Sequence, residues 1–217
     1  MAWFSSRREL ENGFYLKEDT IYRACDGEKT EIIKTNELNL LGRHNYENVM
    51  AAVAMALGIG VPLEAVRETL RRFTAVEHRI EYVTEKRGIR FYNDSKATNP
   101  DAAIQGIGAM NRPTYLIGGG YDKESVYEEW LSSFNGKVKE LVLIGQTRDK
   151  IAETAKRCGF TAITMADSME EAVRICYDHA KSGDAVLLSP ACASFGMFKN
   201  YEERGRIFKE IVRSLEE

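Results

Sequence analysis

The pattern of hydrophobic and polar positions changes near residue 78. Before that point, short apolar stretches at 14–16, 20–22 and 30–35 are separated by turn residues, among them Asp26-Gly27. Asp-Gly between such stretches is a strong signal for a β-hairpin. The first part of the chain is therefore predicted to begin with small antiparallel strands.

Two helices are expected to follow these strands. Ala and Met positions recur from Asn45 through Leu57, and Gly58 is expected to stop this first helix. Pro62 is a favoured first-turn residue for the second helix, and apolar residues up to Phe73 follow at helical spacing. So few elements bury little core on their own, so this region is expected to be the end of a larger domain.

From residue 80 onward, strand-like and helix-like segments alternate. The expected strands are 80–83, 89–92, 114–117, 140–144, 162–165 and 185–188, and the expected helices are 124–134, 148–158, 169–181 and 201–215. Continuous apolar runs suit strands that are buried on both faces, and alternation with helices predicts a mainly parallel sheet. We therefore predict an α/β fold with a Rossmann-like sheet covered on both faces, and a domain boundary near residue 78.

Composition narrows the class of protein. The 217 residues are 44% hydrophobic and 29% charged, which is typical of a globular chain. The net charge of -3 lacks the basic excess of nucleic-acid-binding modules. Four cysteines without C-x-x-C spacing favour neither a disulfide framework nor a zinc site. The longest apolar stretch, 49–61, is too short to span a membrane. We expect a cytoplasmic monomer that binds no nucleic acid and inserts in no membrane.

The polar loop after the strand at 89–92 is the first candidate for a ligand site. Ligands of open α/β sheets bind at the carboxyl ends of strands. Residues 93–99, with the sequence NDSKATN, offer a carboxylate, an ammonium, two hydroxyls and two amides. Pro100 then starts a helix whose free N–H groups can face an anion. A capping loop is the simpler alternative, but so many functional groups favour a ligand site.

Two further strand ends carry candidate chemistry. Gly118 to Gly120 let the backbone approach a ligand, and Lys123 can meet a carboxylate or phosphate, although three glycines also suit a tight turn. The loop 189–201 offers Ser194 and aromatic side chains. Cys192 has no His at readable spacing and is expected to be a buried, inert thiol. No P-loop sequence occurs in the chain.

Three residues outside these loops are also candidates. Asn45 and Asn48 are three apart, so both amides can lie on one helix face and hold a base edge; capping of the helix by Asn45 is an equally good interpretation. Arg79 can reach a phosphate, although a lone surface arginine is usually only solvated. A solvated face is expected for the charged residues of the last helix, Glu202, Glu203, Arg204 and Arg206.

Together these segments resemble the Mur ligase family. The motifs are GRHN…N at 42–48, HR at 78–79, NDSKATN at 93–99, LIGGGYDK at 116–123 and SPACAS…FKNY at 189–201. NDSKATN and SPACAS…FKNY are most similar to the members that add D-glutamate to UDP-N-acetylmuramoyl-L-alanine in peptidoglycan synthesis. The resemblance implies a remnant of the central ATP-binding domain at 1–78 and a C-terminal Rossmann-like domain that binds D-glutamate at 79–217.

The resemblance also implies roles for nine residues. Four would contact ATP, four would hold the carboxylates of D-glutamate, and one lysine would act on the phosphorylated intermediate or the incoming amino acid. In this order they are Asn45 and Asn48 at adenine, Arg79 at a phosphate and Asp94 at the ribose; Thr98, Lys123, Ser194 and the backbone of Tyr201 at D-glutamate; and Lys96. The P-loop, most Mg²⁺ ligands and the UDP pocket would lie in parts of the family fold that this sequence lacks.

The implied reaction forms an acyl phosphate from ATP, which the amine of D-glutamate then attacks. This chain alone is expected to give negligible turnover, and Met1 is expected to mark an engineered boundary or a broken reading frame. Alternatives are a non-catalytic binding module derived from such a ligase and a fragment of a folate-type polyglutamate ligase. A nicotinamide-dependent oxidoreductase is disfavoured, because the first strand–turn–helix unit lacks the dinucleotide glycine fingerprint.

Overall fold

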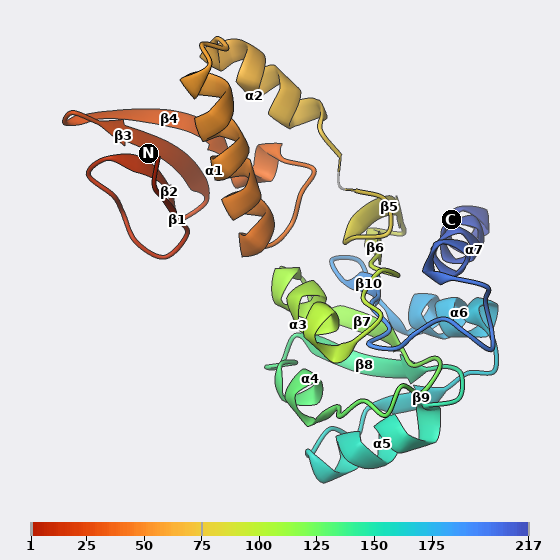
Figure 1. Ribbon diagram of the computed structural model, residues 1–217. Helices are drawn as coiled ribbons and strands as arrows, with labels where there is room; N and C mark the ends of the chain where they lie inside the picture. Colours follow the sequence, from red (N-terminus) through yellow and green to blue (C-terminus); the bar gives the residue numbers. More distant parts are fainter. Residues whose placement is uncertain (1, 75, 217) are drawn as a thin grey trace. The chain divides into compact units, whose positions relative to one another are not determined.

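Two units make up the chain, Met1–Ala75 and Val76–Glu217 (Figure 1). The computed structural model describes residues 2–74 and 76–216. Over those two stretches, no helix combines the length and the apolar character that crossing a membrane requires. The division falls before His78 and Arg79, so both residues belong to the second unit.

The first unit begins with a four-stranded sheet. Its strands, in sheet order, are β1 (Phe4–Ser5), β2 (Gly13–Lys17), β3 (Thr20–Cys25) and β4 (Glu28–Lys34). β1 pairs parallel with β2, and the other neighbours are antiparallel. Asp26 and Gly27 have φ angles of 52° and 83°, the backbone that a tight hairpin needs. The predicted antiparallel strands are confirmed, and β1 was not predicted.

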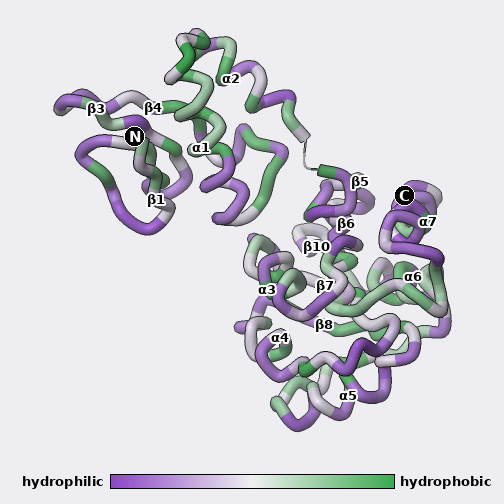
Figure 2. Tube along the Cα trace, in the orientation of Figure 1, coloured by the Kyte–Doolittle hydropathy of each residue, from purple (hydrophilic) through white to green (hydrophobic). Residues whose placement is uncertain are grey.

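A short 3-10 helix, η1 (Thr35–Glu37), leads to α1 (Arg43–Gly58) and α2 (Leu63–Arg72). The second half of α1 is an apolar run, drawn mostly in green in Figure 2. This helix begins before Asn45 and ends at Gly58, as predicted, and the chain then turns at Gly60, which has a φ of 85°. Phe73 lies outside α2 in an extended conformation and is 50% exposed, so its predicted place in this helix is wrong.

The second unit contains a six-stranded sheet. Its strands, in sheet order, are β5 (Glu81–Lys86), β6 (Ile89–Asn93), β10 (Ala185–Leu188), β7 (Thr114–Gly118), β8 (Val138–Leu143) and β9 (Ile163–Met165). β5 is antiparallel to β6, and all other neighbours are parallel. β7, β8 and β10 end in residues that are almost completely buried, as apolar strands inside a parallel sheet require.

Helices cover both faces of this sheet (Figure 1). They are α3 (Pro100–Ala109), α4 (Glu128–Ser132), α5 (Arg148–Arg157), α6 (Met169–His179) and α7 (Tyr201–Ser214). α6 and α7 pack against each other on one face, and α3, α4 and α5 follow one another on the other. The Rossmann-like α/β prediction is confirmed. α4 is shorter than expected because Glu124 has a φ of 60°, which an α-helix does not accommodate.

The strand order decides where the candidate loops lie. β10 is inserted between β6 and β7, so Leu188 pairs with both Asn93 and Ile117. Because these three strands are parallel, their carboxyl ends reach the same edge of the sheet. The loops that follow them, 93–99, 119–123 and 189–200, are therefore neighbours, as the rule for ligand sites in open sheets requires.

Candidate functional site

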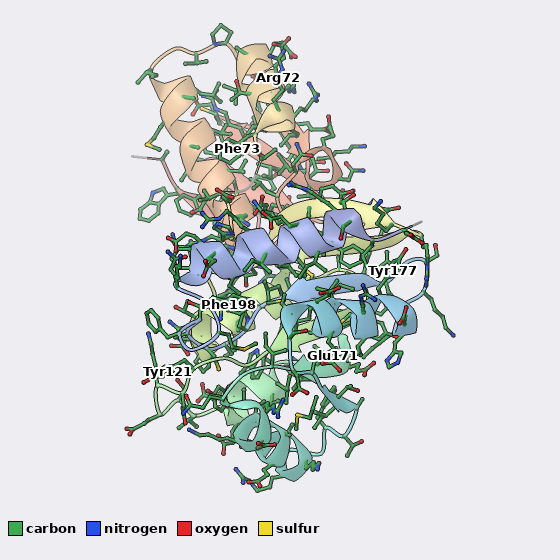
Figure 3. The ribbon with its side chains drawn as sticks, turned by 90° about the vertical axis from the view of Figure 1, so that its right-hand side faces the viewer. Arg72, Phe73, Tyr121, Glu171, Tyr177 and Phe198 are labelled. Atoms are coloured by element: carbon green, nitrogen blue, oxygen red, sulfur yellow. The ribbon has the colours of Figure 1, made fainter. Side chains whose placement is uncertain are left out.

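Backbone hydrogen bonds join the three loops at the carboxyl ends of β6, β10 and β7. The amide of Asp94 donates to the carbonyl of Leu188 at 2.8 Å, and the amide of Tyr121 donates to the carbonyl of Ala193 at 2.9 Å. The Tyr121 and Phe195 rings meet edge to face with centroids 6.1 Å apart. Figure 3 shows Tyr121 and Phe198 on the same side of the second unit. The three polar motifs of the sequence thus form one continuous edge.

The glycines after β7 are needed for the close packing of this edge. A Cβ on Gly119, whose φ is 94°, would lie 2.2 Å from the carbonyl oxygen of Ile144. A Cβ on Gly120, whose φ is 153°, would lie 2.3 Å from the carbonyl oxygen of Ala193. No side chain fits at either distance. The tight-turn interpretation therefore explains these glycines without a ligand.

The residues assigned to D-glutamate lie on these three loops and at the start of α7. Ser194 is buried, Thr98 is half-buried and Lys123 is exposed. Tyr201 is the first residue of α7, and its carbonyl accepts a hydrogen bond from the Ser95 hydroxyl at 2.7 Å. The set therefore combines a solvent-facing ammonium with two hydroxyls at the edge of a single unit, a composition that suits an anionic ligand.

Lys96, the residue assigned to catalysis, faces solvent. Its Nζ lies 5.7 Å from the centroid of the Tyr201 ring, and its backbone amide donates to the carbonyl of His78 at 3.0 Å. The backbone of Lys96 is thus fixed while its ammonium remains accessible. Three residues further on, Asn99 caps α3 by accepting a hydrogen bond from the amide of Ala102 at 2.9 Å. The capping interpretation of this loop therefore holds for Asn99.

Asp94 lies inside the second unit, with only 4% of its surface exposed. One carboxylate oxygen accepts from the Ser189 hydroxyl at 2.8 Å, and the other accepts from the amide of Ile80 at 3.2 Å. Burial raises the pKa of the Asp94 carboxyl to about 7, and these two hydrogen bonds act in the opposite direction. Asp94 therefore ties the segment before β5 to the end of β10; contact with a ribose stays a prediction.

Arg79 is exposed and lies between two residues with unusual backbone angles. His78 and Ile80 have φ angles of 67° and 47°, which non-glycine residues adopt only when their surroundings hold them. The hydrogen bond from the Ile80 amide to Asp94 is one such restraint. The structure thus fixes the backbone on both sides of Arg79 and leaves the guanidinium in solvent.

A buried polar network supplies the second restraint on this segment. Glu81 accepts from the amide of His78 and from the side-chain amide of Asn93, both at 3.0 Å. Asn93 Nδ2 also lies 2.9 Å from His78 Nδ1. Lys209, on α7, donates to Glu77 at 2.7 Å and to Glu81 at 2.9 Å. Burial lowers the pKa of His78, so its ring is held neutral at ordinary pH.

The two asparagines assigned to adenine lie on α1, in the first unit. Gly42, and not Asn45, is the residue before this helix, so the capping interpretation of Asn45 is wrong. The side-chain amide of Asn45 instead donates to the carbonyl of Leu41 at 2.7 Å. Asn48 is exposed. Asn45 is therefore partly engaged within its own unit, while Asn48 presents its amide to solvent.

Cys192 is 2% exposed, and its thiol lies 3.1 Å from the hydroxyl of Tyr127 and 3.4 Å from that of Thr147. Burial raises the pKa of this thiol, so it is held in its unreactive form. Thr147 directly precedes α5, but its side chain makes no capping hydrogen bond to this helix. Its hydroxyl instead accepts from the amide of Gly120 at 3.0 Å, which connects the loop after β8 to the same edge.

Arg204 is the clearest residue that the sequence interpretation missed. The expected solvated face is wrong at this position, because Arg204 is 1% exposed. It donates to the Ser95 hydroxyl at 2.9 Å, to the Ser95 carbonyl at 2.7 Å and to the Cys192 carbonyl at 3.0 Å. The helical spacing of Arg204, Phe208 and Val212, all buried, carried the signal for its position on the inner face of α7.

Potential metal ligands are scattered over the part of the chain that the structure describes. Among residues 2–74 and 76–216, no group of three or more His, Cys, Asp or Glu side chains comes together in a way that could hold a metal ion.

The chain is similar to curated and solved proteins of one group. It is 56% identical over 217 residues to a UDP-N-acetylmuramoylalanine--D-glutamate ligase from Lachnoclostridium phytofermentans, which covers all of this chain and 48% of that protein. A protein of the same name from Lachnospira eligens is 54% identical over 215 residues, which cover 99% of this chain and 48% of that protein. The chain thus spans about half the length of the curated relatives it matches.

Solved structures show the same fold at low sequence identity. A UDP-N-acetylmuramate-alanine ligase from Thermotoga maritima has a TM-score of 0.66 at 16% identity and covers 97% of this chain and 47% of that one. A folylpolyglutamate synthase from Mycobacterium tuberculosis, complexed with ADP, has a TM-score of 0.60 at 15% identity and covers 94% of this chain and 48% of that one.

A family model completes the assignment. Residues 78–192 match the model described as Mur ligase, glutamate ligase domain, and they make up just over half of the chain. These residues include β5 to β10, the loops after β6 and β7, and the first residues of the loop after β10. The chain therefore belongs to the Mur ligase family.

Proposed function

We propose that this chain is the C-terminal part of a ligase that adds D-glutamate to UDP-N-acetylmuramoyl-L-alanine in peptidoglycan synthesis. The observation that carries the proposal is the single edge on which Thr98, Lys123 and Ser194 lie, in a unit matched to a glutamate ligase domain. Identities of 56% and 54% to ligases of this name support the choice of substrate. The folate-type alternative has support from fold alone, at 15% identity.

In this proposal, the second unit binds and orients the amino acid. Lys123 faces one carboxylate of D-glutamate, and the hydroxyls of Thr98 and Ser194 donate to the carboxylates. Hydrogen bonds with an ionised partner are about twice as strong as neutral ones, so this set of donors can bind the two carboxylates of D-glutamate in competition with water. Tyr201 contributes its backbone at the amino end of α7, where the helix dipole favours an anion.

The proposed reaction has two steps. The γ-phosphoryl group of ATP is transferred to the carboxylate of UDP-N-acetylmuramoyl-L-alanine, which gives ADP and an acyl phosphate. The amine of D-glutamate then attacks the acyl carbon, and the C–O bond to phosphate breaks as the peptide bond forms. In this proposal Lys96, exposed beside Tyr201, orients the phosphorylated intermediate or the incoming amino acid. The second unit contributes mainly positioning.

We also propose that Asn45, Asn48, Arg79 and Asp94 belong to the ATP site of the whole enzyme. The solved relative complexed with ADP supports nucleotide binding by this family. The exposure of Asn48 and Arg79 suits contact with adenine and a phosphate, respectively. Mg²⁺ would be held chiefly by residues outside this chain. Because the chain spans about half of its curated relatives, we expect negligible ligase turnover from these 217 residues alone.

Titration of the isotope-labelled 217-residue chain with D-glutamate and with L-glutamate tests the substrate assignment. We expect saturable NMR shifts of the amides of Thr98, Lys123 and Ser194 with the D-isomer at millimolar concentrations, and weaker responses with the L-isomer. Lys123→Met should weaken binding about tenfold, since a hydrogen bond to a charged group contributes about 1.5–3 kcal/mol. Lys156→Met, at an exposed lysine of α5, is the matched control.

Two outcomes would count against this assignment. Equal responses to both isomers would remove the stereochemical part of the proposal. Equal weakening by Lys123→Met and Lys156→Met would show that general electrostatic attraction, and not the edge of β6, β7 and β10, accounts for the shifts.

A further inference from the structure

Arg204 places a positive charge inside the second unit, where the Asp94 carboxylate attracts it without forming an ion pair. All three of its hydrogen bonds go to uncharged oxygens, the hydroxyl and carbonyl of Ser95 and the carbonyl of Cys192. No ion pair with Arg204 occurs among residues 76–216 of its unit that the structure describes. Removing a charge from water costs several kcal/mol, and a buried apolar side chain usually stabilises a fold at least as well. Packing alone therefore does not explain an arginine here.

The oxygens that Arg204 contacts belong to the loops of the proposed D-glutamate site. Ser95 is three residues before Thr98, and Cys192 is two residues before Ser194. The Ser95 hydroxyl, which accepts from Arg204, in turn donates to the carbonyl of Tyr201 at 2.7 Å. One guanidinium thus connects the loop after β6, the loop after β10 and the start of α7.

The third loop is connected to this centre through the backbone. Tyr121 donates to the carbonyl of Ala193, the residue next to Cys192, and Gly119 donates to the carbonyl of Pro190, both at 2.9 Å. Ala191, which lies between Pro190 and Ala193 in the sequence, has a φ of 56°, an angle that the surrounding contacts must maintain. The loop that carries Lys123 therefore takes its position from the same segment, 190–193, that Arg204 holds.

The shape of the side chain matches this task. A guanidinium presents its donors in a rigid planar fork, so it can hold two carbonyls and a hydroxyl in fixed relative positions. A lysine ammonium keeps the charge but lacks the fork. A neutral apolar residue would fill the space and leave the Ser95 and Cys192 oxygens without these donors.

We propose that Arg204 is a positioning residue for D-glutamate, which fixes Ser95 and Cys192 so that Thr98, Ser194 and Tyr201 are held in one arrangement before the ligand binds. The inference rests on the proposed function. Preorganised ligand-binding groups bind more tightly because less conformational freedom is lost on binding. Arg204 acts through the loops and does not itself contact the ligand.

The test compares Arg204→Lys with Arg206→Lys in the full 217-residue chain. Arg206 lies on the same helix but is exposed, so its variant controls for the change of side chain. We expect Arg204→Lys to weaken D-glutamate binding about tenfold and to narrow the difference between D- and L-glutamate, because misplaced groups lose their orientation. Arg206→Lys should leave both quantities unchanged.

Amide hydrogen exchange separates this inference from the proposed function. Ala97 donates to Asp94 and Phe198 donates to Ser194, so these two amides report on the two loops without any ligand. Arg204→Lys should speed their exchange about tenfold relative to the amide of Ala172 on α6, since opening of the loops becomes easier. If the wild-type chain binds neither isomer, the proposed function fails, and this exchange measurement alone decides the role of Arg204 in ordering the loops.

Ser95→Ala provides a milder variant in case Arg204→Lys does not fold. It removes the hydroxyl that links Arg204 to Tyr201 and leaves the two carbonyl contacts in place. An effect on D-glutamate affinity smaller than that of Arg204→Lys but larger than that of Arg206→Lys supports the proposal. Unchanged affinity, D/L ratio and loop exchange in a folded Arg204→Lys or Ser95→Ala chain would overturn it.

Discussion

The two units of the chain bury different kinds of side chain. Among residues 2–74, the buried core is aliphatic and aromatic, and Ser6 and Thr20 are the buried polar residues. The second unit has an equally apolar centre but also buries polar and charged side chains around the carboxyl ends of its strands. These are His78, Asn93, Asp94, Ser95, Thr147, Ser189, Ser194 and Arg204.

This difference separates folding from function. Burying apolar surface stabilises a fold directly, whereas a buried polar group costs free energy unless its hydrogen bonds are replaced. The first unit uses burial almost entirely in the first way, with Ser6 and Thr20 as its buried polar residues among those described. At one edge of the second unit, buried polar groups are joined in networks that hold loops and a strained segment in place. A cluster of buried polar groups therefore indicates residues that position a binding site and not only residues that stabilise the fold.

The largest effect is expected from Asp94, whose folded-state pKa of about 7 lies well above the ordinary value near 4. Between those two pH values the folded chain holds a proton on Asp94 that the unfolded chain has lost. Its contribution to stability is therefore present below about pH 4 and is lost as pH rises to about 7. The shift corresponds to a cost of about 4 kcal/mol for ionising the buried carboxyl at high pH. Asp94→Asn cannot ionise, so this pH-dependent cost should be absent from the variant.

The measurement is urea unfolding of the second unit across pH 4–8. In a Trp3→Phe background, Trp130 is the remaining tryptophan, and because it is fully buried its fluorescence reports on this unit. The stability of Asp94→Asn relative to wild type should rise with pH, whereas Asp178→Asn, at an exposed carboxylate of α6, should show no such trend. His78 has a lowered pKa, so its protonation should destabilise both chains equally as pH falls below about 6.5, and this contribution cancels from the difference between them. A pH-independent difference for Asp94→Asn would show that this carboxylate is not destabilised by burial.

The next largest effect tests the apolar core of the first unit. Met50 on α1 is 0% exposed, and Met→Ala substitutions in cores cost about 2–5 kcal/mol. Met50→Ala should therefore speed amide exchange in this unit while D-glutamate affinity stays within about twofold, because the residues assigned to D-glutamate all belong to the second unit and sites without shared partners contribute independently. Met55→Ala on the same helix, at 67% exposure, is the control. A loss of D-glutamate affinity in Met50→Ala would show that the core of the first unit affects the binding site of the second unit.

Much of this organisation was predictable from the sequence. Asp26-Gly27 indicated the hairpin, and apolar strands that alternate with helices indicated the parallel sheet. The motifs after β6, β7 and β10 fell at neighbouring strand ends because strand direction alone decides on which edge such residues lie. These features depend on local pattern and on general rules of sheet topology.

The buried polar contacts were not predictable in the same way. Arg204 lies among Glu202, Glu203 and Arg206, so local charge indicated solvent, while its helical spacing to Phe208 indicated the core. Two of its three hydrogen bonds go to Ser95, more than 100 residues away in the sequence. Thr147 likewise directly precedes a helix, a position typical of a cap, but its hydroxyl accepts from the amide of Gly120 instead. Long-range partners decide such positions, and a single sequence does not name them.

A smaller effect sharpens the contrast within the loop after β10. Ser189 and Ser194 are both buried, but Ser189 donates to Asp94 whereas Ser194 is assigned to D-glutamate. Ser194→Ala should weaken D-glutamate binding about tenfold, since a hydrogen bond to a carboxylate contributes about 1.5 kcal/mol or more. Ser189→Ala should alter the pH dependence of stability and leave the affinity within about twofold. NMR titration of both variants checks this, and equal affinity losses would contradict the division of roles.

The smallest effect is expected from Lys139→Met, which tests whether every buried polar group of the second unit contributes to ligand binding. Asp184 is 4% exposed but lies at the amino end of β10, opposite to the proposed site, and Lys139 donates to its two oxygens at 2.9 and 3.1 Å. Asp184 also accepts from the amide of Lys181 at 2.9 Å, so the turn keeps a partner when the lysine is lost. Lys139 is 42% exposed, and water can replace it, so Lys139→Met should lower stability by only about 0.5–1 kcal/mol. D-glutamate affinity should not change. A fall in D-glutamate affinity as large as in Ser194→Ala would show that any buried polar group of the unit is coupled to the ligand. Unchanged affinity would show that the residues of the site are distinguished by their position at the carboxyl ends of β6, β10 and β7.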